Sequence, residues 1–253
     1  MGALPRPQLA PRPLHLGLDT ATALSPVADQ VQAVATEAVV PGLEPNGVQL
    51  DAVHTTVAAL YVDPKGVYAN LPGVDVWDEV RDARRYAWPW PVVAHPPCAS
   101  WSAWAGMREA VYGRPRGEDG GCFAAALDAV RTFGGVVEHP AYSKAWDAFG
   151  LPIPSVEGGW SQTLDGQWTC SFDQAAYSLR FNKHTWLYYA GDTPPDYIAW
   201  QRPRTGRGPD DVWSDVRSST PPLMAEYLVR LARQSREIDL EALPDPEASW
   251  ALR

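Results

Sequence analysis

Strand-like apolar runs alternate with helical patterns in the middle of the chain. Val57–Val62 is an apolar run that stops at Asp63-Pro64, and Pro91–Ala94 is a second, shorter one. Between them, residues 75–87 (DVWDEVRDARRYA) interleave charged and apolar positions at helical spacing and predict a helix. The order strand, helix, strand predicts a parallel α/β arrangement, because parallel neighbours need a crossover connection.

A second crossover follows. Residues 122–133 (CFAAALDAVRTF) form an apolar helical stripe that includes Cys122 and ends at Gly134-Gly135. Val136-Val137 then predicts a strand ending at Glu138, and a long irregular stretch is expected up to Gln174. The last elements expected are a strand at Thr185–Ala190 and an amphipathic helix at 221–234, opened by two prolines.

These elements predict one α/β domain over residues 14–235. A proline-rich arm, 1–13, precedes it, and an acidic tail, 236–253, follows it. A helix is also expected over 27–39. With 25 Pro and 12 Trp, the loops are expected to be long and rich in both residues. No apolar run approaches the roughly 18 residues needed to cross a bilayer, and the opening segment is not a secretory signal, so we expect a cytoplasmic protein without a membrane span.

Charge limits the choice of partner. The net charge of −9 opposes nonspecific attraction to a polyanion, so any contact with nucleic acid must be local. Residues 180–207 hold five basic and two acidic side chains, interleaved with Trp186, Tyr197 and Trp200. This segment suits contact with phosphates and stacking on bases, although a solvated charged face is the simpler interpretation.

The sharpest motif is HPPCASWS, residues 95–102, directly after a predicted strand. Ligands of open α/β sheets bind beyond the carboxyl ends of strands, where Cys98 would lie. Glu138 ends the next predicted strand, 40 residues later, with a helix between. Two parallel strands joined in this way bring the thiol and the carboxyl group to one edge of the sheet.

At these residues the sequence resembles the cytosine-C5 DNA methyltransferases. PPCASWS is similar to the nucleophile motif Pro-Cys-Gln, and Glu138-His139-Pro140 to the motif Glu-Asn-Val or Glu-Asn-Pro. Tyr177–Gly191 and Ser218–Ala225 are similar to two later motifs, in the family's order. The resemblance covers roughly residues 90–235 and implies a Rossmann-like, mostly parallel methyltransferase-type sheet.

The resemblance also implies a reaction. The Cys98 thiolate would add to C6 of cytosine, which activates C5 toward an electrophilic methyl group from S-adenosylmethionine. Glu138 would bind the N3 and N4 edge of the base, and Lys183 or Arg180 would favour the thiolate. In a duplex the base would be flipped into the site. Small relatives of this kind resemble bacteriophage proteins, which would act in the host cytoplasm.

Further residues are assigned by the same resemblance. Asp63 would bind the cofactor ribose and Asp75 would lie near the adenine. Pro96, Ser219 and Thr220 would complete the cofactor side. On the substrate side we expect Pro97, Ser100, Ser102, His139, Trp186, Arg202 and Arg204.

Several departures keep other functions open. Ala99 replaces the family's Gln, His139 replaces its Asn, and residues 1–60 lack the glycine turn of the cofactor site. The segment between about Asp192 and Arg217 is too short for a separate DNA-reading domain. A pyrimidine nucleotide is therefore an alternative to DNA as the substrate. A non-catalytic module that binds nucleic acid or protein is another alternative, as is a zinc enzyme using His95, Cys98, Cys122 and His139.

Overall fold

The computed structural model describes residues 56–102, 105–113, 115–201, 203, 205–208 and 218–236. All of them belong to one compact unit, Val53–Arg253. The arm expected at 1–13, the helix expected at 27–39 and the tail from residue 237 lie outside the described residues.

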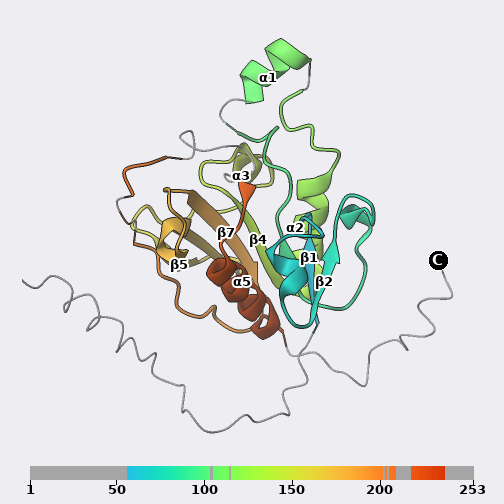
Figure 1. Ribbon diagram of the computed structural model, residues 1–253, viewed down its shortest axis with the longest axis vertical. Coiled ribbons are helices and arrows are strands. Elements are labelled where there is room, and N and C mark those ends of the chain that lie inside the picture. The colour runs from blue at the N-terminus through green and yellow to red at the C-terminus, as the bar shows by residue number, and fades with distance from the viewer. Residues whose placement is uncertain are drawn as a thin grey trace, which may run out of the picture. The chain divides into compact units, whose positions relative to one another are not determined.

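A seven-stranded sheet organises these residues, in the order β2-β1-β3-β4-β7-β6-β5 (Figure 1). The strands are β1 (Val57–Leu60), β2 (Val74–Trp77), β3 (Val92–Ala94), β4 (Gly135–Pro140), β5 (Gly159–Gln162), β6 (Trp168–Asp173) and β7 (His184–Ala190). The neighbours from β2 to β4 pair in parallel, and those from β4 to β5 pair antiparallel. The α/β class is confirmed, whereas the expectation of a mostly parallel sheet is wrong, because the sheet is mixed.

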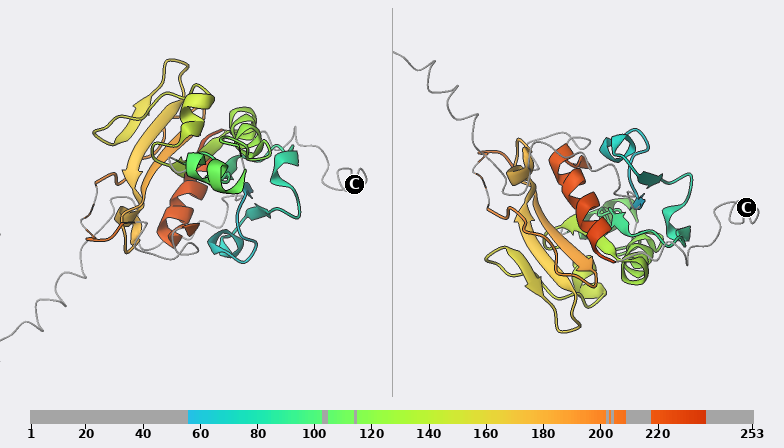
Figure 2. Two further views of the ribbon diagram at one scale, coloured as in Figure 1. Left: turned by 90° about the horizontal axis from the view of Figure 1, so that it is seen from above. Right: turned by 90° about the horizontal axis from the view of Figure 1, so that it is seen from below.

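Helices cover both faces of this sheet. Helix α2 (Cys122–Phe133) packs on one face and α5 (Pro222–Gln234) on the other, as the two views of Figure 2 show. Helix α1 (Ala105–Tyr112) projects at the top of Figure 1. The remaining helical elements are α3 (Lys144–Ala148) and the 3₁₀ turns η1 (Val67–Asn70), η2 (Ala83–Arg85) and η3 (Gln174–Tyr177).

Strand alternation assigns side chains to the two faces. In β3, Val92 and Ala94 join the core under α2, while Val93 joins the core under α5. In β4, Val137 faces α2 and Val136 faces α5. Successive strand residues point to opposite faces, so the faces of the residues just beyond these strands follow from the same alternation.

Two predictions of local structure are wrong. The helix expected at 75–87 is instead the edge strand β2 followed by η2, since its apolar side chains pack against β1 and its charges stay near solvent. The stretch expected to be irregular up to Gln174 contains α3, β5 and β6. Strand β6 carries the polar residues Thr169 and Ser171 in a buried position, which hides the apolar signal of a strand.

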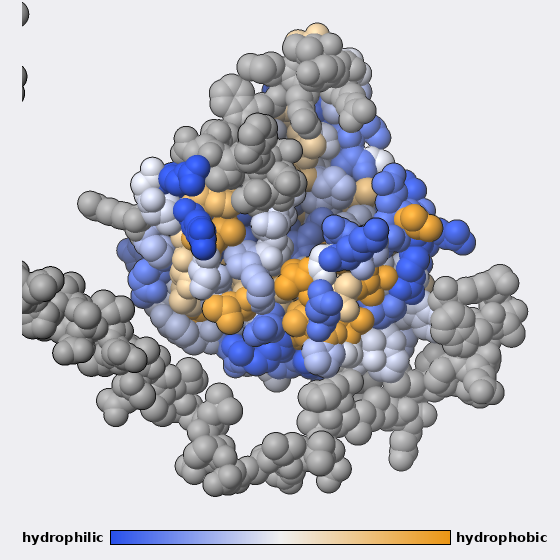
Figure 3. Space-filling model, in the orientation of Figure 1, coloured by the Kyte–Doolittle hydropathy of each residue, from blue (hydrophilic) through white to orange (hydrophobic). Residues whose placement is uncertain are grey.

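The face seen in Figure 1 has apolar residues near its centre and polar residues toward its border (Figure 3). Among the described residues, no helix combines the length and hydropathy needed to cross a membrane.

Candidate functional site

The register between β3 and β4 brings His95 beside Glu138. Ala94 pairs with Val137 in this parallel ladder, so the next residues, His95 and Glu138, lie side by side on the α5 face. The His95 Nδ1 atom lies 3.0 Å from Glu138 Oε2. The register of these two strands therefore brings together two residues that are 43 positions apart in the sequence.

Glu138 is a buried carboxylate with two nitrogen partners. Its side chain is 8% exposed, and Gln174 Nε2 donates a 2.9 Å hydrogen bond to Oε1. Burial by itself raises the pKa of this carboxyl group, but the charge of Lys183 and the hydrogen bond from His95 outweigh it and lower the pKa to about 2. At neutral pH Glu138 is ionised and acts as a hydrogen-bond acceptor.

A second layer of contacts holds these partners. The Tyr68 hydroxyl lies 2.7 Å from His95 Nε2, and Tyr68 is 3% exposed. Gln174 Nε2 also donates to Thr185 Oγ1, at 3.0 Å, and Thr185 Oγ1 in turn donates to the carbonyl of Lys183. The network of hydrogen bonds around Glu138 thus extends from η1 to β7.

Lys183 approaches this cluster from the turn before β7. Its Nζ donates to the Ser219 carbonyl at 3.2 Å, which ties the residue before α5 to the site. Ser219 and Thr220, both assigned to the cofactor, immediately precede the Pro221-Pro222 start of α5. Arg180 is exposed in the turn after η3. The structure therefore brings Lys183 to Glu138, whereas it leaves Arg180 at the surface.

Cys98 is exposed in a tight turn just beyond β3. The backbone N–H of Trp101 donates to the Cys98 carbonyl at 3.1 Å, and the Ser102 hydroxyl donates to the Ala99 carbonyl. The Ser100 carbonyl accepts from the backbone of Gly117. The thiol therefore lies on an ordered loop at the carboxyl edge of the parallel strands, three residues beyond His95.

Two residues assigned to the substrate lie elsewhere. His139 and Trp186 are buried in the core under α2, on the face opposite Glu138. His139 Nδ1 lies 2.7 Å from Ser143 Oγ, and burial lowers the pKa of His139 to about 4. Its interactions with the backbone of Pro97 and Pro96 place the loop before Cys98 next to its ring. These side chains are packing residues that support the loop.

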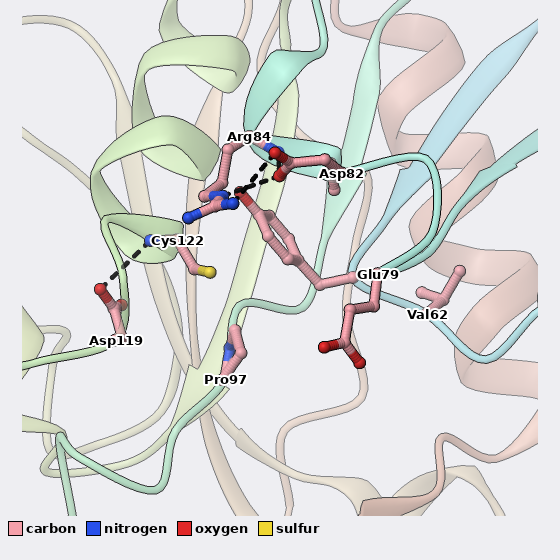
Figure 4. A pocket seen from close by; sticks show the side chains of 9 residues that line it. Val62, Glu79, Asp82, Arg84, Pro97, Asp119 and Cys122 are labelled. Carbon is pink, nitrogen blue, oxygen red and sulfur yellow. Dashed lines mark hydrogen bonds and ion pairs between the residues drawn. The ribbon is translucent and has the colours of Figure 1, made fainter. Parts of the chain in front are cut away.

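A cavity of about 520 Å³ opens at the carboxyl ends of β1, β2 and β3. Three carboxylates and one guanidinium line it, together with the Cys122 thiol (Figure 4). Its lining residues are Tyr61, Val62, Glu79, Asp82, Ala83, Arg84, Pro97, Asp119 and Cys122. The prediction that Cys122 belongs to the core is corrected, because the first residue of α2 borders this cavity.

Charged residues of the cavity wall are fixed by their own contacts. Arg84 pairs with Asp82 at 2.7 Å. Asp119 accepts from the backbone N–H groups of Gly121, Cys122 and Phe123, which caps the start of α2. Glu79 is exposed at the cavity rim. The cavity therefore has an ordered, acidic wall.

Tyr61 makes the turn at the end of β1. Its φ of 61° lies in the left-handed region that usually belongs to glycine. This backbone conformation turns the ring toward the α2 side, where it packs against that core and lines the cavity. The sharp turn after β1 is thus made at a tyrosine, which no glycine pattern in the sequence could reveal.

None of the residues assigned to the cofactor from the sequence lines the cavity. Pro97, which was assigned to the substrate, does line it. Asp63 is exposed and accepts from the backbone of Lys65 within its own turn. Asp75 pairs with Arg81 at 2.6 Å. Pro96 is buried. Glu79 and Asp82, which the sequence analysis does not single out, line the cavity, whereas Asp63 and Asp75 do not.

The zinc alternative finds no support in the geometry. In the part of the chain that the structure describes, no three or more His, Cys, Asp or Glu side chains converge as metal ligands. His95 and His139 face opposite sides of the sheet, each with its own hydrogen-bond partner. Arg202 and Arg204, assigned to the substrate, lie outside the described residues.

No protein-family model, curated protein or solved structure matches this chain.

Proposed function

We propose that this protein modifies C5 of a pyrimidine, with cytosine in DNA as the substrate and S-adenosylmethionine as the methyl donor, on a Rossmann-like sheet in the cytoplasm. The observation that supports it most is that an exposed Cys98 follows β3 while a buried, ionised Glu138 lies on the neighbouring parallel strand β4, just past the last residue that pairs with β3. A nucleophile beside an ordered acceptor is the arrangement that covalent activation of a pyrimidine needs.

The proposed reaction is an addition to the pyrimidine ring followed by an elimination. The Cys98 thiolate forms a bond to C6, and the C5–C6 π pair moves toward C5 and the N3 side of the ring. C5 would then bond to the methyl group as the methyl–sulfur bond of the donor breaks, with its electron pair left on the sulfur. Loss of the C5 proton to water and departure of Cys98 as thiolate restore the double bond. Glu138 accepts a hydrogen bond from the N4 amino group, which stabilises the adduct.

The cavity beside the Cys98 loop fits the cofactor. Its volume of about 520 Å³ lies within the range of small-molecule sites. Glu79, Asp82 and Asp119 give the wall a negative charge that suits a sulfonium, and a carboxylate at a strand end suits the hydroxyls of a ribose. When bound, S-adenosylmethionine supplies an electrophilic methyl group and leaves as a neutral thioether. Pro97 borders the cavity and precedes Cys98, so the two sites adjoin.

Trapping the covalent adduct tests the proposal. A pool of DNA of random sequence, single-stranded or duplex and containing 5-fluorocytosine, is incubated with the full chain and S-adenosylmethionine. Fluorine at C5 cannot leave as a cation, so the reaction stops at the adduct with Cys98 and a protein–DNA band survives denaturing electrophoresis. Cys98→Ala should abolish the band, and Glu138→Gln should slow its formation about 10²- to 10³-fold.

Cys170→Ala is the matched control, because Cys170 is buried in β6 away from the Cys98 loop. This variant should form the adduct at the rate of the natural chain. An adduct with 5-fluoro-deoxycytidine monophosphate but not with DNA would redirect the proposal to a nucleotide. Absence of any adduct with every donor would overturn it in favour of a binding module.

A further inference from the structure

The hydrogen-bonded chain Tyr68–His95–Glu138 is not accounted for by covalent pyrimidine chemistry alone. Its two links measure 2.7 Å and 3.0 Å, and they connect η1, the end of β3 and β4. The Tyr68 and His95 rings lie 5.3 Å apart with a tilt of 50°, so the contact is also a packing contact. Two of the three members are buried, and the His95 side chain is 13% exposed.

The donors and acceptors along the hydrogen-bonded series Tyr68–His95–Glu138 favour one protonation state of the His95 imidazole. Burial, and then the charge of Glu138, raise the pKa of Tyr68 well above its ordinary value, so its hydroxyl keeps its proton. Glu138 is ionised and only accepts. If Tyr68 donates to Nε2, then Nε2 is unprotonated and Nδ1–H donates to Glu138 Oε2. Every proton is then used in a hydrogen bond.

The protonated imidazole fits less well. An Nε2–H would donate to the Tyr68 oxygen, and the buried Tyr68 proton would need another acceptor. Among the described residues, no hydrogen bond of the Tyr68 hydroxyl other than the one to His95 is seen. The cost of leaving a buried donor unsatisfied therefore opposes protonation of His95, although the Glu138 charge favours it.

We infer that His95 is a positioning residue, and this inference rests on the proposed function. Tyr68 holds His95 as the neutral Nδ1–H tautomer. His95 in turn keeps the Glu138 carboxylate ionised and directed at the base. Gln174 holds the second carboxylate oxygen in the same way. One lone pair on each oxygen stays available for the N3 and N4 edge. Glu138 thereby serves as a fixed acceptor rather than as a proton donor.

Other charges around this pair are few. Lys183 acts on Glu138 from the turn before β7, and His139, next on β4, acts on it from the opposite face. Tyr68 is the titratable group that contacts His95 from η1. These groups define which variants can change the charge or the hydrogen bonds around Glu138.

Nuclear magnetic resonance of the imidazole nitrogens in the full chain tests the tautomer without any activity. The His95 signals are the ones lost in His95→Asn, and they should report the Nδ1–H tautomer, with Nε2 accepting a hydrogen bond. Tyr68→Phe keeps the ring and removes only the hydroxyl, so the preference of His95 for this tautomer should weaken. A protonated His95, or the Nε2–H tautomer, in the natural chain would overturn the inference.

Adduct formation tests the positioning role separately. His95→Leu removes the donor and should slow the adduct on the order of 100-fold. His95→Asn keeps an N–H near the Nδ1 position and should recover most of that loss. Tyr68→Phe should slow the adduct less than His95→Leu does, because Glu138 still accepts from Nδ1–H while the tautomer is held less firmly. If these variants leave the rate unchanged, or if His95→Asn fails to recover it, His95 is only structural. If the natural chain forms no adduct, the proposed function fails while the tautomer measurement still decides the state of His95.

Discussion

The charge of Lys183 lowers the pKa of Glu138, although the two residues come from segments that are 45 positions apart. Antiparallel pairing of β4 with β7 places the start of β7 next to the end of β4, with Pro140 opposite Thr185. Lys183 Nζ also donates to the Ser219 carbonyl. The antiparallel half of the sheet therefore supplies the cation, and the parallel half supplies the carboxylate.

Replacing Lys183 should change stability in a pH-dependent way. The pKa of Glu138 lies below its ordinary 4.5, at about 2, so its contribution to stability is complete above pH 4.5 and disappears as the pH falls toward 2. Lys183→Met raises that pKa, and each unit costs about 1.4 kcal/mol of unfolding free energy at pH 7. Urea unfolding between pH 3 and 8 should show a deficit that shrinks as the pH falls.

The control for this prediction is Lys144→Met. Lys144 forms an exposed pair with Asp147 on α3, at 3.6 Å, and its loss should change stability by less than about 1 kcal/mol at any pH. A deficit in Lys183→Met that is the same at pH 3 and pH 8 would mean that Lys183 acts through its hydrogen bond to Ser219 and not through its charge on Glu138.

Much of the fold could be read from local patterns, but pairing directions could not. The apolar runs at β1 and β3 and the stripes of α2 and α5 carry periodic signals that survive in isolation. Strand β2 has charged neighbours on both sides and was assigned to a helix, since an edge strand exposes one side. The antiparallel direction of β7 follows from its pairing with β4 and β6, and the buried polar residues of β6 hide that strand in the sequence.

The sequence predicts only those parts of the site whose positions follow from the order of the strands along the chain. Cys98 follows β3 and Glu138 lies on β4, the next strand of the parallel half, so chain order alone predicts both near one sheet edge. His95 was identified only as a candidate metal ligand, because its contacts with Tyr68 and Glu138 depend on the register of β3 and β4 and on where η1 packs. Tyr61 could not be found, since a left-handed tyrosine leaves no mark in the sequence.

Removing the Tyr61 hydroxyl should separate stability from ligand binding. This hydroxyl is buried, and no hydrogen-bond partner for it is seen in the described residues. Burial, and then the neighbouring Cys122, raise the pKa of Tyr61 above its ordinary value. Tyr61→Phe should therefore leave the free energy of unfolding unchanged or raise it by about 1 kcal/mol. If the hydroxyl contacts a ligand in the cavity, calorimetry should show S-adenosylmethionine binding weakened about tenfold.

Tyr86→Phe is the matched control. The Tyr86 hydroxyl donates to the Trp90 carbonyl at 2.7 Å, so its removal should cost about 1 kcal/mol and leave ligand affinity unaltered. A loss of stability in Tyr61→Phe as large as in Tyr86→Phe would show that the Tyr61 hydroxyl is satisfied within the protein.

The three cysteines should label in a fixed order, because their environments differ. Cys98 is exposed, Cys122 is partly buried at the cavity, and Cys170 is fully buried. Burial, and then Asp119, raise the pKa of Cys122, and burial raises the pKa of Cys170 well above its ordinary value. Thiolates are the reactive form, so iodoacetamide at pH 8 should modify Cys98 first, Cys122 slowly and Cys170 only after unfolding. Mass spectrometry of the peptides measures each rate.

Ligands should then protect different thiols. The Cys122 sulfur points toward the cavity bounded by Arg84 and Pro97 (Figure 4). S-Adenosylmethionine should therefore slow the labelling of Cys122 and leave Cys98 reactive, whereas single-stranded DNA should slow Cys98 and leave Cys122 unchanged. Adenosine at the same concentration controls for partial occupancy and should protect Cys122 less. Protection of Cys98 by S-adenosylmethionine with Cys122 still reactive would place the cofactor outside the cavity and contradict the assignment of Glu79 and Asp82.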